Sequence, residues 1–244
     1  MKYITIILLL LSTTLFAQFP DAKTVIDNVD KNMSSKNRII TSKMIIHGKR
    51  GSRTIESISY SEGDKKSYTE YLSPTREAGT KMLKLEDKLW IFSPSTDRII
   101  QISGHMLRQS VMGSDLSYED MMEDQKLTDI YNAKVIAAEN LDGRKCWILE
   151  LKAKQADVAY QKRKIWVDQE RFVPLKEELF AKSGQLLKKT TLSEVKQIDG
   201  RWYPTKIVYK DMLKSGSGTE FIITDMKFNQ DIPDYLFTKA ALKK

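Results

Sequence analysis

A long series of short, alternating segments constrains this chain more than any other feature. From Ile39 onward, apolar and polar side chains alternate in runs of about five to eight residues, with Gly, Pro, Asp or Ser between the runs. The connections are too short for crossover helices, so neighbouring strands must be antiparallel. We therefore predict a mainly β fold with strands near 40–46, 54–60, 66–72, 81–85, 89–92, 98–102, 135–138, 146–151, 164–167, 173–180, 186–192, 202–209 and 219–228.

These strands form two series, about six before residue 105 and about seven after it. One large antiparallel domain can hold them all at this chain length. Two separate β-sandwiches, divided near residue 105, are the alternative. The sole cysteine, Cys146, excludes an internal disulfide, so the apolar core must stabilise the fold unaided.

One helix is predicted ahead of the strands, over residues 20–33. Its apolar side chains recur every three or four residues and so share one face, and Pro20 suits the first turn. This stripe must pack against the sheet. Its members are Ala22, Val25, Ile26, Val29 and Met33.

Residues 105–130 separate the two series of strands and have a different character. Two short helices are expected there, hinged at Gly113, and Ser117 with Asp120 forms a capping-box-like start. Such an insert typically closes one mouth of a barrel or covers one face of a curved sheet. Its acidic residues, which we attribute to helix capping rather than to a metal site, are Asp115, Glu119, Asp120, Glu123 and Asp124.

The N-terminus has the order of charge, apolar run and small residue that is typical of a secretory signal peptide. Lys2 is followed by an uncharged, mostly apolar stretch from Tyr3 to Phe16, and then by the small residue Ala17. A membrane span needs about 20 apolar residues, and this run is shorter. Gln18 stands where a lipoprotein would have cysteine. We predict a signal peptide over 1–17 and an unlipidated periplasmic domain over 18–244.

The residues offer little support for catalysis or for nucleic-acid binding. The only histidines, His47 and His105, lie in different elements without the spacing of a zinc site, and nucleophile or phosphate-loop motifs are missing. The net charge of +8 comes from basic residues scattered one or two at a time, with acidic residues between them. We expect no enzymatic activity, cofactor, metal or nucleic-acid partner.

Several stretches resemble the LolA-like family of outer-membrane lipoprotein-sorting proteins, in a divergent branch close to a treponemal lipoprotein domain. The resemblance covers nearly the whole mature chain, and residues 112–121, MGSDLSYEDM, carry its most specific motif. The other matching stretches are GTKML at 79–83, LWIFSP at 89–94, RIIQIS at 98–103, WVD at 166–168, IDGRWYPT at 198–205, IPD at 232–234 and FT at 237–238.

The resemblance implies an unclosed antiparallel β-barrel of about eleven strands, wrapped around helices and enclosing an apolar cavity for acyl chains. It implies a monomeric periplasmic carrier, or chaperone, of lipoprotein acyl chains or phospholipid, with an inner-membrane exporter and an outer-membrane acceptor as partners. Alternatives are a lipid shuttle serving a resistance-nodulation-type exporter and an envelope-stress sensor on the same scaffold. The family's cargo-handling arginine has no assigned position, which leaves Arg98 and Arg108 as candidates.

Six apolar residues are the candidate ligand contacts. Trp90 and Phe92 share one face of a strand, where they either pack in the core or line the cavity, and we expect the insert to cover that concave side. Methionine adapts to irregular partners, so the methionines of the insert either plug the core or line the cavity. The insert's candidate contacts are Met106, Leu107, Val111 and Met112.

Overall fold

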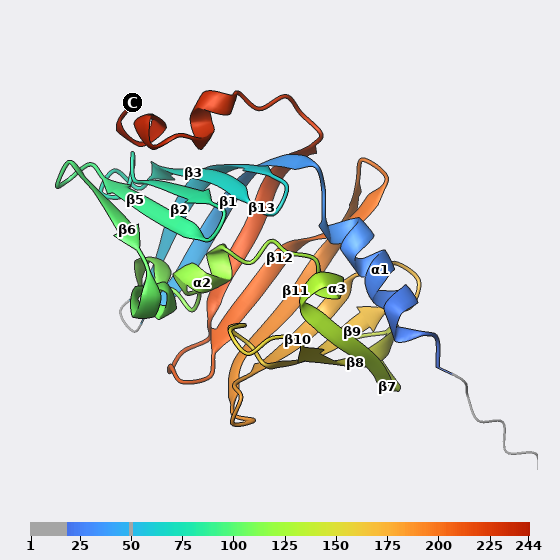
Figure 1. Cartoon of the computed structure of the whole chain (residues 1–244). Helices are drawn as coiled ribbons and strands as arrows, with labels where there is room; N and C mark the ends of the chain where they lie inside the picture. Colours follow the sequence, from blue (N-terminus) through green and yellow to red (C-terminus); the bar gives the residue numbers. More distant parts are fainter. Residues whose placement is uncertain (1–18, 49–50) are drawn as a thin grey trace, which may run out of the picture.

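A computed structural model describes residues 19–48 and 51–244. Thirteen strands form one antiparallel sheet in the order β6-β5-β4-β3-β2-β1-β13-β12-β11-β10-β9-β8-β7 (Figure 1). The predicted mainly β fold is confirmed. The strands are β1 Asn37–Gly48, β2 Gly51–Glu62, β3 Lys66–Ser73, β4 Lys81–Leu85, β5 Lys88–Ser93, β6 Arg98–Ile102, β7 Tyr131–Leu141, β8 Arg144–Ala153, β9 Lys162–Asp168, β10 Pro174–Phe180, β11 Leu186–Ile198, β12 Arg201–Asp211 and β13 Thr219–Phe228.

The sheet is strongly curved but does not close. Hairpins join consecutive strands within each series, and the pairing of β1 with β13 joins the two series into one sheet. Strands β6 and β7 are its two edges, so the predicted unclosed barrel is confirmed, with thirteen strands where the resemblance implied about eleven. A single continuous sheet rules out the two-sandwich alternative.

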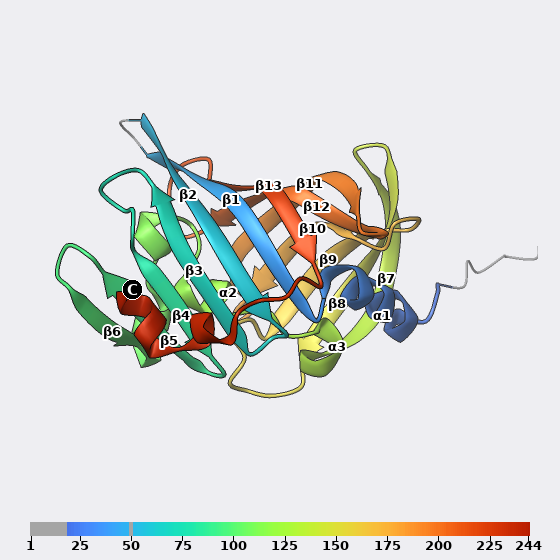
Figure 2. The ribbon, with the colours of Figure 1, turned by 90° about the horizontal axis from the view of Figure 1, so that it is seen from above.

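Helix α1, Ala22–Met33, forms where the apolar stripe predicts it. The Asp21 carboxylate caps it by accepting the Thr24 N–H at 2.9 Å. Val25, Ile26 and Val29 are almost fully buried against the inward side chains of β7, β8 and β9. Figure 2 shows α1 lying across the end of that half of the sheet.

The insert is a chain of single turns rather than two helices. It comprises η1 Gly104–Arg108, η2 Val111–Gly113, α2 Tyr118–Met121 and α3 Leu127–Ile130. The predicted capping box is confirmed, because Ser117 and Asp120 bond each other's backbone N–H groups at 2.6 and 3.2 Å. In Figure 1 the insert lies inside the curve of the sheet.

A C-terminal segment covers the other face of the first series of strands. Two short 3-10 helices, η3 Asp234–Phe237 and η4 Lys239–Lys243, pack on β3, β4 and β5 from outside the curve. Figures 1 and 2 both show this segment, in red, on the convex side. Strands β3 to β5 are therefore covered on both faces.

The predicted signal peptide lies outside the described residues and stays a prediction. In the part of the chain that the structure describes, no helix combines the length and apolarity needed to cross a bilayer.

Candidate functional site

A cleft opens on the concave face, between the two series of strands. Its volume is about 310 Å³. One wall is apolar and comes from inward-facing residues near the centre of the sheet, where β1 and β13 meet. This wall is formed by Ile40, Leu192, Tyr203, Ile207, Phe221 and Ile223.

The facing wall carries a band of hydroxyl groups. Ser59 and Ser61 of β2 and Ser67 and Thr69 of β3 point into the cleft. Successive residues of a strand point to opposite faces, so serines two positions apart share the inner face. Ser59 and Thr69 lie opposite each other and their hydroxyls are 2.8 Å apart. The cleft is therefore amphipathic, with one apolar wall and one polar wall.

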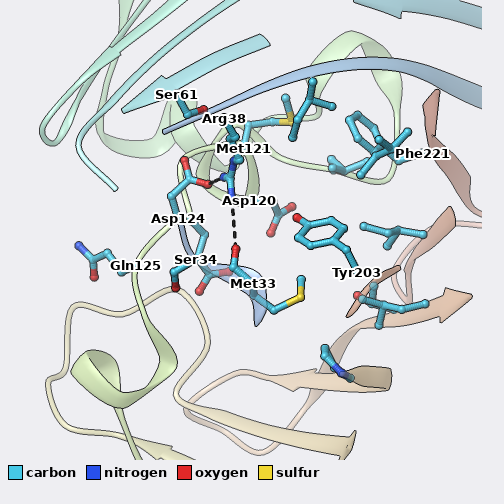
Figure 3. A pocket seen from close by; sticks show the side chains of 18 of the residues that line it. Met33, Ser34, Arg38, Ser61, Asp120, Met121, Asp124, Gln125, Tyr203 and Phe221 are labelled. Carbon is cyan, nitrogen blue, oxygen red and sulfur yellow. Dashed lines mark hydrogen bonds and ion pairs between the residues drawn. The ribbon is translucent and has the colours of Figure 1, made fainter. Parts of the chain in front are cut away.

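Residues 118–125, which we call the acidic strap, cross the mouth of this cleft. The Asp124 carboxylate pairs with the guanidinium of Arg38 on β1, and its second oxygen lies 3.6 Å from Nζ of Lys84 on β4. Lys84 also donates to the strap carbonyl of Met122 at 2.6 Å. Figure 3 shows Arg38 reaching Asp124, with Tyr203 and Phe221 on the opposite side.

Two further ion pairs hold the strap to the second series of strands. Asp120 pairs with Lys188 of β11 and accepts the Tyr160 hydroxyl at 2.5 Å. Glu123 pairs with Arg163 of β9. Burial raises the pKa of Asp120, but its bonds to Lys188 and Ser117 outweigh burial and hold that pKa below its usual value.

Arg163 is surrounded by hydrogen-bonding and ion-pair partners in addition to Glu123. Its Nε donates to the Tyr131 hydroxyl at 2.9 Å, and its guanidinium lies 3.8 Å from the carboxylate of Glu177 on β10. Burial raises the pKa of Glu177, although Arg163 acts in the opposite direction. The interior thus combines an apolar wall with charged groups that are shielded from water.

The insert residues that we predicted as ligand contacts pack in the core beside the cleft rather than in its wall. Met106, Leu107 and Met112 contact an apolar cluster on the inner face of β1 to β6, and Val111 is fully buried. Their neighbours in sequence, Leu116, Asp120 and Met121, reach the cleft. Ligand contact by the four predicted residues remains a prediction.

Trp90 and Phe92 lie on the opposite face of the sheet. They pack against Phe237 and Leu242 of the C-terminal segment, and Nζ of Lys239 lies 4.3 Å from the Trp90 ring centre. The expectation that the insert covers Trp90 and Phe92 is therefore wrong. Strand β5 alternates Leu and Ile with Trp and Phe, so both faces are apolar and the pattern alone did not identify the inner one.

The other sequence candidates lie away from the cleft. Arg98 is exposed at the start of β6, and Arg108 borders a separate hollow beside the insert. His47 bonds Ser52 and Glu220, each at 2.8 Å, near the end of β1.

Sequence reasoning missed the charged and hydroxyl residues of the cleft, although two signals were present. Ser57, Ser59 and Ser61 recur with the period of a strand, which marks a polar inner face. Arg163 and Lys188 stand at positions where the alternation of their strands calls for an inward side chain.

Three solved structures share this architecture. A domain described as an outer membrane lipoprotein-sorting protein, from Vibrio parahaemolyticus, is 24% identical with a TM-score of 0.80, covering 91% of this chain and 98% of its own. A DUF1329 family protein from Desulfovibrio piger is 26% identical, with a TM-score of 0.81 and the same coverage. A LolA superfamily protein from Nitrosomonas europaea is 28% identical, with a TM-score of 0.73 and coverage of 90% and 98%.

The sequence itself matches one family model. Residues 63–244 match a family described as "uncharacterized protein". No curated protein matches the sequence. The resemblance to the LolA-like group, predicted from motifs, is confirmed by these solved structures.

Proposed function

The chain belongs to the family whose model matches residues 63–244, and we propose that it is a periplasmic, non-catalytic carrier that binds an acyl chain of a lipoprotein or lipid in the cleft. The structures similar to it include a domain described as a lipoprotein-sorting protein and a LolA superfamily protein. An exporter in the inner membrane and an acceptor in the outer membrane would be its partners.

The apolar wall of the cleft is the observation that carries this proposal. Ile207 of β12 pairs with Leu192 on one side and Phe221 on the other, so three apolar side chains form a continuous inner surface. Moving an acyl chain from water onto such a surface contributes about 0.8 kcal/mol per buried methylene. Binding of this kind needs no covalent step.

The size of the cleft limits what it holds with the strap in place. Ligand pockets usually span about 300–1,000 Å³, and this cleft, at about 310 Å³, lies at the lower end. It accommodates part of one lipid rather than a cargo with several acyl chains. A larger cargo requires the strap to move.

The first test is identification of native cargo. We expect the protein purified from its own cell envelope to carry lipid or lipoprotein that mass spectrometry detects. The delipidated protein should bind a fluorescent fatty acid. If neither native lipid nor fatty-acid binding is found, the carrier proposal fails.

A matched pair of substitutions tests whether the cleft is the binding site. Ile207→Trp fills the apolar wall, whereas Val208→Trp places the same side chain on the outer face of the same strand. Overpacking costs about 1–3 kcal/mol of stability, so both variants are first checked for folding. We expect Ile207→Trp alone to lose fatty-acid binding. Equal binding by both folded variants would contradict the assignment.

Trp90→Ala separates ligand contact from core packing on β5. Trp90 is 7% exposed beneath the C-terminal segment, so its truncation should cost about 3–5 kcal/mol of stability. Binding per folded molecule should be unchanged, because the ring lies outside the curve of the sheet. Weaker binding with unchanged stability would place the ligand at Trp90 instead.

A further inference from the structure

Four basic side chains inside the curve of the sheet converge on the acidic strap. They come from strands far apart in the sheet order, namely β1, β4, β9 and β11. Between 5% and 16% of each side chain is exposed, so all four are withdrawn from water. These cations are Arg38, Lys84, Arg163 and Lys188.

The strap neutralises this group with three carboxylates within five residues of sequence. Asp120 faces Lys188, Glu123 faces Arg163, and Asp124 faces both Arg38 and Lys84. The remaining carboxylates in the cleft are those of Glu177 and Asp30. Asp30 is already engaged, because it accepts the N–H groups of Leu127 and Thr128 at 2.9 and 3.0 Å.

Apolar packing of the middle of the strap is only partial, since Tyr118, Met121 and Met122 pack against the apolar cluster on the inner face of β1 to β6 without being fully buried. None of the residues of α2, Tyr118–Met121, is fully buried. The flanks are different, because Val111 and Leu116 are buried on one side and α3 is tied to Asp30 on the other. The strap is therefore anchored at both ends, while its centre combines partial apolar packing with ion pairs to four cations.

Withdrawal of the strap removes three carboxylates from these four cations. Arg38, Lys84 and Lys188 then have no ion-pair partner among the described residues, while Arg163 keeps Glu177. Lys84 still donates to the Asp64 carbonyl. Buried charges without partners are costly. An anionic group that offers several oxygens offsets this cost, and the guanidinium fork suits both phosphate and carboxylate. Among the described residues, the buried Nε of Arg38 has no hydrogen-bond partner and is a spare donor beside the cleft.

We propose that the acidic strap is an internal stand-in for the anionic headgroup of the cargo, so that the cleft selects lipids that carry a phosphate or carboxylate and exchanges the strap for that group. This inference rests on the proposed carrier function and specifies its cargo. The acyl chain lies on the wall formed by Leu192, Ile207 and Phe221. The headgroup takes the place of the Asp124 carboxylate between Arg38 and Lys84, and the hydroxyls of Ser61 and Ser67 line the same cleft as Arg38.

The test uses four probes with the same twelve-carbon chain. Dodecyl phosphate and laurate are anionic, dodecanol is neutral and dodecyltrimethylammonium is cationic. We expect both anions to bind at least about tenfold more tightly than dodecanol, which corresponds to 1.4 kcal/mol, and the cation to bind most weakly. The ratio of phosphate to carboxylate affinity identifies the preferred headgroup. Equal affinity for all four overturns the inference but leaves the carrier function, whereas no binding by any probe defeats both.

Two substitutions test the exchange directly. Asp124→Asn weakens the stand-in without changing its shape, so affinity for dodecyl phosphate should rise about five- to tenfold. Lys84→Met removes one of the four cations that face the strap. The affinity for dodecyl phosphate should therefore fall, while the affinity for dodecanol should be unchanged. Lys23→Met, on the exposed face of α1, is the control and should change neither. Weaker phosphate binding by folded Asp124→Asn would overturn the proposal.

Hydrogen exchange in the unaltered protein supplies a readout that does not depend on the variants folding. The strap amides should exchange faster when dodecyl phosphate is bound and should be unchanged by dodecanol. Unchanged exchange with the phosphate bound would show that the anion does not displace the strap.

Discussion

Helix α1 and the acidic strap both lie on the concave face, and they are held by different forces. Helix α1 buries Val25, Ile26 and Val29 almost completely against the second series of strands. The strap packs its apolar side chains only partly, with none of the residues of α2 fully buried, and adds carboxylates that face strand cations. Apolar packing has no specific substitute in water, whereas an ion pair can exchange one anion for another. The comparison therefore identifies α1 as permanent core and the strap as a replaceable cover.

Among the changes that compare α1 with the strap, Ile26→Ala in α1 should have the largest effect. Its side chain is 2% exposed, and truncation of a buried isoleucine costs about 2–5 kcal/mol. Chemical denaturation should show this loss as a lower midpoint with an unchanged slope. Met121→Ala in the strap is the matched control, and it should cost less because Met121 is only partly buried. Equal losses of stability in the two variants would contradict the distinction between α1 and the strap.

Asp120→Asn should release the strap locally rather than unfold the protein. The substitution removes the negative charge of the carboxylate that pairs with Lys188 and accepts a hydrogen bond from the Tyr160 hydroxyl. Its loss should weaken docking of the strap by about 1–3 kcal/mol. Amide exchange should therefore accelerate about tenfold or more over residues 118–125 and stay unchanged in α1. An equal acceleration in α1 would mean that the strap and the helix open as one unit.

Acid should undock the strap before it affects the packing of α1. The folded pKa of Asp120 lies below the ordinary value of 3.8, so its ion pair stabilises docking above that pH and is lost as the pH falls through the folded pKa. The strap's amide NMR signals should keep their positions from neutral pH down to about 4 and move below it. Movement at neutral pH would show that Asp120 does not control docking.

Lys23→Ala should have the smallest effect. The pair between Lys23 and Asp27 joins two exposed positions of α1, four residues apart at 2.6 Å. Exposed pairs of this kind contribute little to stability, because water and salt screen the attraction. A melting temperature close to that of the unaltered chain is expected. A larger loss would show that surface charge, and not only burial, stabilises α1.

The correct sequence predictions concern features that depend on residues close together in the chain. The apolar stripe of α1 and the Ser117–Asp120 capping box each depend on residues three or four positions apart in the sequence. The alternating runs likewise located all thirteen strands, because successive side chains of a strand point to opposite faces. The order of the strands around the sheet follows from these hairpins except at one pairing, β1 with β13.

The errors and omissions concern which side of a strand becomes the inside. Strand β5 is apolar on both faces because the insert covers one and the C-terminal segment covers the other, so Trp90 and Phe92 were assigned to the wrong side. Arg163 and Lys188 looked like ordinary members of a charged sequence. The alternation of their strands assigns them to the inner face, but only the curvature of the sheet brought them together over one acidic segment.

The sequence by itself determined the local periodicity, the turns and the capping residues, because these depend on backbone and side-chain geometry over a few residues. The tertiary structure alone decided the pairing of β1 with β13, the covering of β5 on both faces and the meeting of Arg38, Lys84, Arg163 and Lys188 over one acidic segment. These contacts join residues far apart in the chain. Their free energy depends on burial and on distances between charges, which exist only once the sheet has curved.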